Sequence, residues 1–340
     1  MAQVILTLDE ARDLSRRCLL ANGCDAANAD AITGVMILAE RDGCASHGLF
    51  RLPGYVSALR DGRANGAADP SVKRIAPGVL RVDGDLGYAP LALERGRAPL
   101  IAAARETGIA AMSLVRTFHL AALWPEVEAI TEQGLVALAM TSSRSLVAPA
   151  GGTQAVFGTN PMAFGWPRPD GPPMVFDQAV SVMARGEVQI AARDGHPLPD
   201  GAALDSNGQP TNDAQAAVDG VLLPFGGYKG SSIGLMIELL AAGLLGENFS
   251  FETSEQFADD GGPGRGGELI IAIDPARFGD PAGWQAHAET FFARMTQQDG
   301  VRLPGTRRHD NRSRISAQGF AIPASLHDEI AALTAGEAVP

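Results

Sequence analysis

A histidine and an arginine four residues apart are the side chains of this sequence best suited to chemistry on a small anion. They belong to the run Arg41-Asp42-Gly43-Cys44-Ala45-Ser46-His47-Gly48-Leu49-Phe50-Arg51. Arginine pairs with a planar carboxylate through two parallel hydrogen bonds, and histidine gains or loses a proton near neutral pH. If this stretch is helical, the spacing places His47 and Arg51 on one face. The pattern predicts a bound carboxylate and a proton transfer; its alternative is a surface histidine beside a solvated arginine.

Two glycine-containing or small-residue clusters could also bind anions. Residues 117–124 fall where a predicted strand meets a predicted helix, so free backbone amides there could attract an anion, although ordinary packing gives the same pattern. Residues 223–232 place Lys229 among glycines before an apolar helix. The order Lys-Gly-Ser excludes an ATP-binding P-loop, which needs Gly-Lys-Ser. Two interpretations of these residues remain: an anion site around Lys229, or a simple tight turn.

An arginine-rich segment lies near the C-terminus, with five arginines in residues 302–314. Guanidinium groups suit a nucleotide phosphate, and a solvated basic edge is the alternative. The sequence lacks a Gly-x-Gly-x-x-Gly motif after a strand near the start of a βαβ unit, so a Rossmann dinucleotide site is not expected. The nearest string, residues 262–267, follows two aspartates and is expected to form a mobile loop.

Composition limits the function further. The 340 residues, 46% of them hydrophobic, can fill one large domain or two to three closely packed ones. A net charge of -12 argues against binding to nucleic acid or to an anionic membrane. Acidic residues at positions 9, 10 and 13 interrupt any signal peptide, and the most apolar segment, residues 233–245, falls short of the ~20 residues of a membrane span. The three cysteines lack zinc-type spacing, so we expect a cytoplasmic protein without a structural metal.

Hydrophobic periodicity predicts a helical first sixty residues and a mixed α/β body after them. Thr7 and Glu10 form a capping box for a helix ending near Asn22, and Ser46 is expected to cap a helix reaching Leu59. The other predicted helices are Ala26–Arg41, Pro90–Thr107, Leu123–Gln133, Ser231–Leu245, Trp284–Gln298 and Ala324–Leu333. The predicted strands are Val79–Val82, Ile109–Val115, Gly134–Thr141, Ala155–Phe164, Met174–Asp177 and Leu269–Ile273. Residues 194–220, rich in glycine and proline, predict a lid or a meander.

In their order along the chain, these strings resemble the malate/L-lactate dehydrogenase family of NAD(P)-dependent oxidoreductases, which lacks a Rossmann fold. The resemblance rests on Arg41-Asp42-Gly43, Ser46-His47-Gly48, Arg51, Gly158-Thr159-Asn160-Pro161, Phe176-Asp177, Ala184-Arg185-Gly186, Gly226-Gly227-Tyr228-Lys229-Gly230 and Pro304-Gly305. Further strings are similar to the branch of the family that reduces cyclic imino acids. They are Ser46 to Tyr55, His119 to Pro125, Glu132 to Leu138, Phe157 to Pro161, Leu222 to Lys229, Glu238 to Leu244, Asn248 to Glu252 and Arg302 to Gly305.

The resemblance implies an α/β (α+β), non-Rossmann fold in which helices surround a mixed, mainly antiparallel sheet. It also implies a homodimer with a small carboxylate substrate. Three regions are expected: a helical region 1–70 that packs with 300–340, a substrate and dimerisation region 71–125, and an NADPH-binding region 126–300.

The implied activity is NADPH-dependent reduction of Δ1-pyrroline-2-carboxylate to L-proline and of Δ1-piperideine-2-carboxylate to L-pipecolate, with NADH as the weaker cofactor. By position, the resemblance assigns catalysis to Ser46, His47 and Glu187, and substrate contacts to Arg51, Thr159 and Arg185. It assigns no metal. The implied cofactor contacts are His119, Leu120, Ala121, Ala122, Leu123, Asp177, Gln178, Ala179, Tyr228, Lys229, Arg302, Leu303, Pro304, Gly305, Thr306, Arg307 and Arg308.

Three positions depart from the family pattern. Glu187 stands where an aspartate is expected as the acid of the proton relay, and Arg185 and Tyr228 stand where the related reductases carry histidine. Two alternatives stay open. One is a 2-hydroxyacid dehydrogenase of the malate, lactate, sulfolactate or ureidoglycolate type, because Arg51 and His47 serve a keto acid equally well. The other is a ligand-binding homologue without catalysis, which the change at Glu187 permits.

Overall fold

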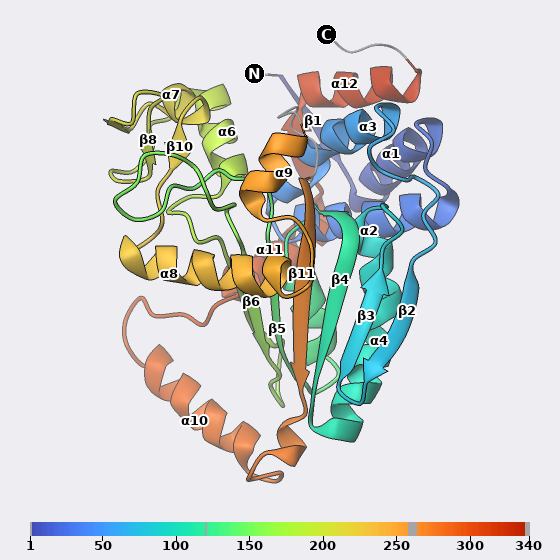
Figure 1. Cartoon of the computed structure of the whole chain (residues 1–340), viewed down its shortest axis with the longest axis vertical. Helices are drawn as coiled ribbons and strands as arrows, with labels where there is room; N and C mark the ends of the chain where they lie inside the picture. Colours follow the sequence, from blue (N-terminus) through green and yellow to red (C-terminus); the bar gives the residue numbers. More distant parts are fainter. Residues whose placement is uncertain (1, 120, 258–263, 337–340) are drawn as a thin grey trace.

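A seven-stranded sheet forms the centre of the computed structural model, which describes residues 2–119, 121–257 and 264–336 (Figure 1). β3 and β4 are parallel, and the other neighbouring strands of this sheet are antiparallel. The expected mixed, mainly antiparallel sheet is therefore confirmed. Across the sheet the order is β2 (Ser71–Ala76), β3 (Val79–Asp83), β4 (Ile109–His119), β11 (Gly264–Ile273), β5 (Val136–Thr141), β6 (Met162–Trp166) and β7 (Met174–Gln178).

Helices cover both faces of this sheet, because alternate residues of each strand point to opposite sides. On β11, Ile270 and Ala272 join the core beneath α4 (Ala89–Thr107) and α5 (Trp124–Thr131). Leu269 and Ile271 instead face α8 (Tyr228–Ile237), which continues without a break into a π-helix, η3 (Glu238–Gly243). The expected helix Ser231–Leu245 is thus confirmed with an earlier start.

The two ends of the described chain lie together beside this core (Figure 1). β1 (Gln3–Leu6) pairs antiparallel with β12 (Phe320–Pro323), and neither strand was expected from the sequence. Here α1 (Leu8–Ala21) and α2 (Ala26–Arg41) share a core with α12 (Ala324–Thr334). The predicted capping box is confirmed, since the Thr7 amide donates to Glu10 Oε2 at 2.8 Å and the Glu10 amide donates to Thr7 Oγ1 at 3.2 Å.

The prediction of a helix that begins at Ser46 is wrong. Two short 3₁₀ turns, η1 (Ala45–His47) and η2 (Leu49–Arg51), come first, and α3 (Leu52–Arg60) follows them. Gly48, with φ -92° and ψ -140°, extends the backbone between the turns. The Ser46 hydroxyl contacts Nδ1 of its neighbour His47 at 3.0 Å and caps no helix. His47 and Arg51 therefore do not share the face of one helix.

The prediction that the glycine-rich residues 262–267 form a mobile loop is also wrong for residues 264–267, which the structure describes. Residues 258–263 lie outside the described chain, but residues 264–267 begin β11 in the middle of the sheet. A Cβ on Gly266 would meet the carbonyl oxygen of Ser142, and one on Gly267 would meet that of Ala241. These glycines therefore allow close approach of neighbouring backbones.

Several local elements were missed or shortened. The expected strand Ala155–Phe164 is regular only as part of β6, and the meander expected for residues 194–220 is confirmed as a small antiparallel sheet with one short helix. That sheet consists of β8 (Ala203–Leu204), β9 (Pro210–Thr211) and β10 (Val221–Leu222), beside α7 (Ala214–Val218). The remaining elements are α6 (Arg185–Asp194), α9 (Ser250–Gln256), η4 (Pro275–Arg277), α10 (Trp284–Thr296) and α11 (Thr306–Gln318).

Glu40 ties α2 to the turns that carry the histidine. Its side chain is buried, and its Oε1 accepts the Leu49 amide at 2.8 Å. A Cβ on Gly48 would collide with this carboxyl group, so the glycine after His47 is required by close packing. Burial raises the pKa of Glu40 to about 7.

Glu40→Gln is expected to make stability less dependent on pH. Because the pKa of Glu40 is raised from 4.5 to about 7, the folded state holds this proton more tightly than the unfolded state. Stability therefore falls as pH rises through that window. Gln keeps an acceptor for Leu49 and cannot ionise, so between about pH 5 and pH 8 the variant should gain on the order of 3 kcal/mol relative to wild type. Urea unfolding across this range measures the gain, and parallel curves would contradict it.

Candidate active site

A cavity of about 130 Å³ opens where the turns after α2, the end of β4 and the start of α6 meet. Six of the predicted catalytic, substrate and cofactor residues line it: His47, Arg51, His119, Ala121, Thr159 and Arg185. They come from segments as far apart as residues 47 and 185. The fold therefore brings the predicted proton donor and the predicted carboxylate ligand into one cavity without a shared helix.

His47 lies deep in this cavity and keeps only part of its ring surface open to it. Burial, together with the nearby charges of Arg51 and His119, lowers the pKa of His47 to about 3. The imidazole is therefore neutral without a ligand at physiological pH. A bound carboxylate would offset the charge of Arg51 and raise the proton affinity of the ring.

Arg51 is held by its backbone surroundings and retains donors for a ligand. Its Nε donates to the carbonyl oxygen of Ser46 at 2.7 Å, and its guanidinium lies 5.3 Å from the centre of the Phe50 ring. The start of α6 packs directly on this arrangement. A Cβ on Gly186 would lie 2.6 Å from Arg51 Nη2 and 3.0 Å from Ser46 Cβ, so only glycine fits here without displacing them.

Glu187, the expected acid of the relay, is not brought to Ser46 or His47. It is exposed at the third position of α6 and does not line the cavity. Its carboxylate turns back and accepts the Ala184 amide at 3.4 Å, as glutamate does at helix N-termini. Arg185, beside it, lines the cavity, and its guanidinium donates to the carbonyl oxygens of Ala217 and Val218 at 3.4 and 2.9 Å.

A buried triad that the sequence did not reveal holds His119 in the cavity wall. His119 Nε2 lies 3.2 Å from Glu126 Oε1 and 3.5 Å from Glu268 Oε2. Burial raises the pKa of Glu126 to about 7 and raises that of Glu268 well above its usual value. The donor atoms lie within 4.8 Å of one another, as in a metal-ligand set, but protonated carboxyl groups also satisfy this geometry. The glutamates come from α5 and β11, so no local sequence signal joins them.

The expected cofactor residues around the start of α5 do gather in space. Asp177, at the end of β7, accepts the backbone amides of Leu123 and Trp124 at 2.8 and 3.1 Å. Arg308 donates to the carbonyl oxygen of Val175 at 2.7 Å and lies 5.3 Å from the centre of the Trp124 ring. The carboxylate of Asp177 thus fixes the backbone that leads from the cavity into α5.

The remaining cofactor predictions are more dispersed. Tyr228 and Lys229 begin α8, are exposed and do not line the cavity with His47. Gln178 ends β7, Ala179 follows it, and Ala122 is buried before α5. Leu120 lies outside the described residues. Arg302, Leu303, Pro304 and Gly305 precede α11, and Thr306 and Arg307 begin it.

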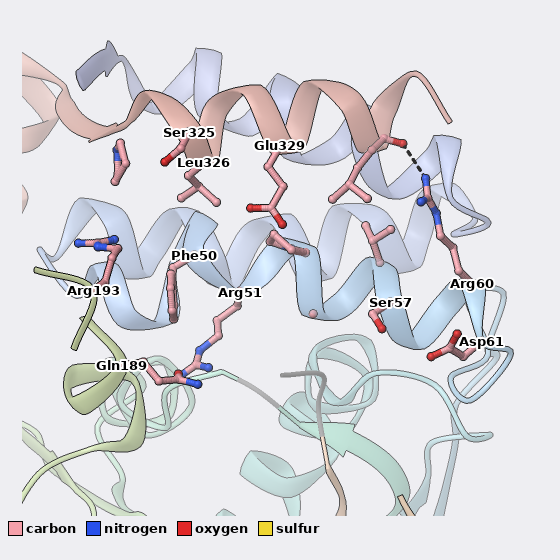
Figure 2. A pocket seen from close by; sticks show the side chains of 15 residues that line it. Phe50, Arg51, Ser57, Arg60, Asp61, Gln189, Arg193, Ser325, Leu326 and Glu329 are labelled. Carbon is pink, nitrogen blue, oxygen red and sulfur yellow. Dashed lines mark hydrogen bonds between the residues drawn. The ribbon is translucent and has the colours of Figure 1, made fainter. Parts of the chain in front are cut away.

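A wider groove of about 520 Å³ runs between α3 and α12 (Figure 2). Figure 2 shows Arg51 and Gln189 along one side of it and Ser325 and Glu329, from α12, along the other. Arg51 and Gln189 also line the active-site cavity, so the two hollows adjoin at these residues.

Comparison with known proteins gives one consistent result. A family model described as malate/L-lactate dehydrogenase matches residues 6–331. A Δ1-pyrroline-2-carboxylate/Δ1-piperideine-2-carboxylate reductase of Pseudomonas aeruginosa is 48% identical over 96% of this chain and 98% of its own. A (2R)-3-sulfolactate dehydrogenase (NADP(+)) of Chromohalobacter salexigens is 42% identical over 96% and 97% of the two chains. The crystal structure of Δ1-piperideine-2-carboxylate reductase from Pseudomonas syringae pv. tomato matches with a TM-score of 0.91 and 42% identity, covering 97% and 99%.

The helices of the described chain include none that is long and apolar enough to cross a membrane.

Gly186→Ala is expected to weaken binding of a small carboxylate at Arg51 by about ten-fold or more, because the added methyl group displaces the guanidinium and a charge-assisted contact is lost. Titration with pyrrole-2-carboxylate, a planar and unreactive ring carboxylate, measures the affinity. Gly34→Ala is the matched control, since a Cβ at Gly34 in α2 meets open space. Equal affinities for the Gly186 variant and wild type would contradict the role of this contact.

Proposed function

The chain belongs to the malate/L-lactate dehydrogenase family, and on that basis we propose that it reduces cyclic 2-imino acids with NAD(P)H. The substrates are Δ1-pyrroline-2-carboxylate and Δ1-piperideine-2-carboxylate, and the products are L-proline and L-pipecolate. The observation that carries the proposal is the near-full-length similarity to reductases of these compounds. The cavity supports it by combining His47, Arg51 and Thr159.

The residues of the cavity suit the two requirements of this reduction. A bound nicotinamide cofactor supplies the hydride for C2, and the electron pair of the C=N bond then moves to nitrogen, which takes a proton. Arg51 holds the substrate carboxylate and so fixes the ring in the cavity. His47, on the same wall, delivers the proton to the ring nitrogen, and its contact with the Ser46 hydroxyl orients the imidazole. Thr159 contacts the substrate across the cavity.

The arginine-rich segment fits a nucleotide phosphate. Arg302 and Arg307 are exposed, and Arg308 Nε is buried without a hydrogen-bond partner among the described residues. A buried donor without a partner costs free energy, which a phosphate oxygen would recover. We therefore propose that the chain prefers NADPH to NADH, with these arginines beside the 2'-phosphate.

A homodimer is proposed as the assembled form. Four apolar side chains along α8, the π-helix and the residue after it are each 40% exposed or more: Leu235, Met236, Leu239 and Leu244. An apolar stripe of this kind on a described surface favours contact with a second copy.

We also propose a cytoplasmic location. The chain is proposed to divide into three regions, which are 1–70 packed with 300–340, 71–125 and 126–300.

A 2-hydroxyacid dehydrogenase is the second candidate function, because the chain is also similar to a sulfolactate dehydrogenase. A 2-keto acid presents a carboxylate to Arg51 and a carbonyl oxygen to His47 in the same geometry as the imine nitrogen. The cavity contacts alone are compatible with both substrates, whereas the stronger similarity favours the imine.

Oxidation of NADPH should be fastest with Δ1-pyrroline-2-carboxylate. We expect its kcat/KM to exceed those of pyruvate, oxaloacetate and 3-sulfopyruvate by at least about 100-fold, and His47→Ala to lower kcat by about 100-fold or more, since a general acid assists by that much. A faster keto acid would establish the dehydrogenase instead. Cofactor binding without turnover of any of the four compounds would indicate a non-catalytic homologue.

Alanine at Arg302, Arg307 or Arg308 should lower NADPH affinity by about 10 to 100-fold and leave NADH affinity nearly unchanged, because each charge-assisted contact to the 2'-phosphate is lost singly. Dissociation constants for both cofactors at one ionic strength measure the effect. Arg314→Ala is the control, since Arg314 lies on the same helix and donates to Asn311 Oδ1. Equal losses for NADPH and NADH, or no loss in any variant, would refute the 2'-phosphate site.

A further inference from the structure

We propose that Glu238, where α8 passes into the π-helix, is a positioning residue that holds Thr159 toward the substrate. It does so through Gly158 and Asn160, the two residues that flank Thr159. The kinetic part of this inference rests on the proposed function, whereas its binding part rests only on the cavity.

The carboxylate of Glu238 is buried and accepts four hydrogen bonds. Oε1 accepts from Asn160 Nδ2 at 2.8 Å, from the Gly158 amide at 3.4 Å and from the Ser250 hydroxyl at 2.5 Å. Oε2 accepts from the Ser250 amide at 3.0 Å. One side chain therefore binds both neighbours of Thr159 and the first residue of α9.

The loop held in this way has a strained backbone. Asn160 has a φ of +36°, in the left-handed region that residues other than glycine rarely adopt. Its side chain is fully buried and also donates to the Gly234 carbonyl oxygen in α8 at 3.2 Å. Pro161 follows directly and restricts the backbone of Asn160 further. Such a conformation persists only where the surroundings hold it, and here the groups that contact the Asn160 side chain are Glu238, the Gly234 carbonyl and, at 3.4 Å, the Ser250 hydroxyl.

Thr159 is constrained from its other side as well. Its carbonyl oxygen accepts the Val180 amide at 2.8 Å, beyond the end of β7. Gly158 has no room for a side chain, because a Cβ would lie 2.6 Å from Asn160 Oδ1 and 2.7 Å from Ser143 Oγ. The direction of Thr159 into the cavity is thus set by residues that do not line the cavity themselves.

The chemistry of Glu238 distinguishes it from an ordinary packing residue. Among the described residues, no arginine or lysine forms an ion pair with it, so neutral donors alone compensate a buried carboxylate. Burying a charge in this way is unfavourable unless each hydrogen bond is well placed. Its position at a π-turn is in keeping with this, since such turns occur frequently at functional sites. Figure 1 shows α8 and α9 on the same side of β11, where Glu238 joins them.

Glu238→Gln tests the proposal, because the amide keeps the volume but presents N–H groups where donors already point. In the full chain, we expect the Kd of pyrrole-2-carboxylate and the KM of Δ1-pyrroline-2-carboxylate to rise by at least about ten-fold. The Kd of NADPH should stay within about two-fold of wild type. A purely structural role would lower the melting temperature and leave the ratio of carboxylate to NADPH affinity unchanged, which would overturn the proposal.

Glu247→Gln is the matched control. Glu247 is also a buried glutamate beyond the π-helix, but it accepts from the Arg116 amide at 2.9 Å and from Arg265 Nε at 3.2 Å, away from the cavity. Its variant should keep both affinities, and an equal loss of carboxylate affinity in it would also overturn the proposal.

Two further measurements test the role of Glu238. If Glu238→Gln does not fold, Ser250→Ala removes one donor to the carboxylate and should raise the Kd of pyrrole-2-carboxylate by about three-fold; an unchanged Kd would count against the proposal. If wild type binds pyrrole-2-carboxylate but reduces no cyclic imine, the proposed function fails, and the binding comparison still decides the role of Glu238.

Discussion

The confinement of His47, Arg51 and His119 in one small cavity is the constraint on which the rest of the site depends. Burial opposes protonation of His47 most strongly, and the Arg51 guanidinium and the His119 imidazole add to this effect, so the histidine is neutral in the absence of a bound anion. A negative charge placed beside Arg51 would offset the part of this effect that comes from the guanidinium. Under the proposed function, substrate binding and proton availability would therefore be linked, and this cavity would give a protein of net charge -12 one place suited to an anion.

The surrounding fold supports this confinement mainly through buried carboxylates. Glu40 fixes the turn after His47, Asp177 fixes the backbone before α5, and Glu126 with Glu268 holds His119. Glu40 and Asp177 accept backbone amides of another element, and the carboxyl groups of Glu126 and Glu268 lie within 3.5 Å of His119 Nε2, so these side chains set the positions of segments relative to their neighbours. A cavity assembled from distant segments needs such cross-links, because no single helix or strand carries two of its working side chains.

Sequence reasoning succeeded where the determining interactions are local. The capping box of α1 and the positions of α2, α4 and β5 follow from residues a few positions apart. It failed where a side chain can form alternative hydrogen bonds. Ser46 contacts His47 and caps no helix. Glu187 accepts an amide at the start of its own helix and does not reach the cavity. The pairing of β1 with β12 and the triad of His119, Glu126 and Glu268 join residues far apart in sequence. No periodicity or spacing encodes those contacts.

The position of Glu187 bears directly on how the relay works. An aspartate at this place would be too short to fold back on the Ala184 amide as readily, whereas glutamate at the third helical position forms this contact well. The added methylene therefore diverts the carboxylate to the helix start. Ser46 and His47 remain in contact without it, and the charge that favours a protonated imidazole then has to come from the substrate. Under the proposed function, the carboxylate of the substrate, held by Arg51, would take over the electrostatic part of the role expected of that acid.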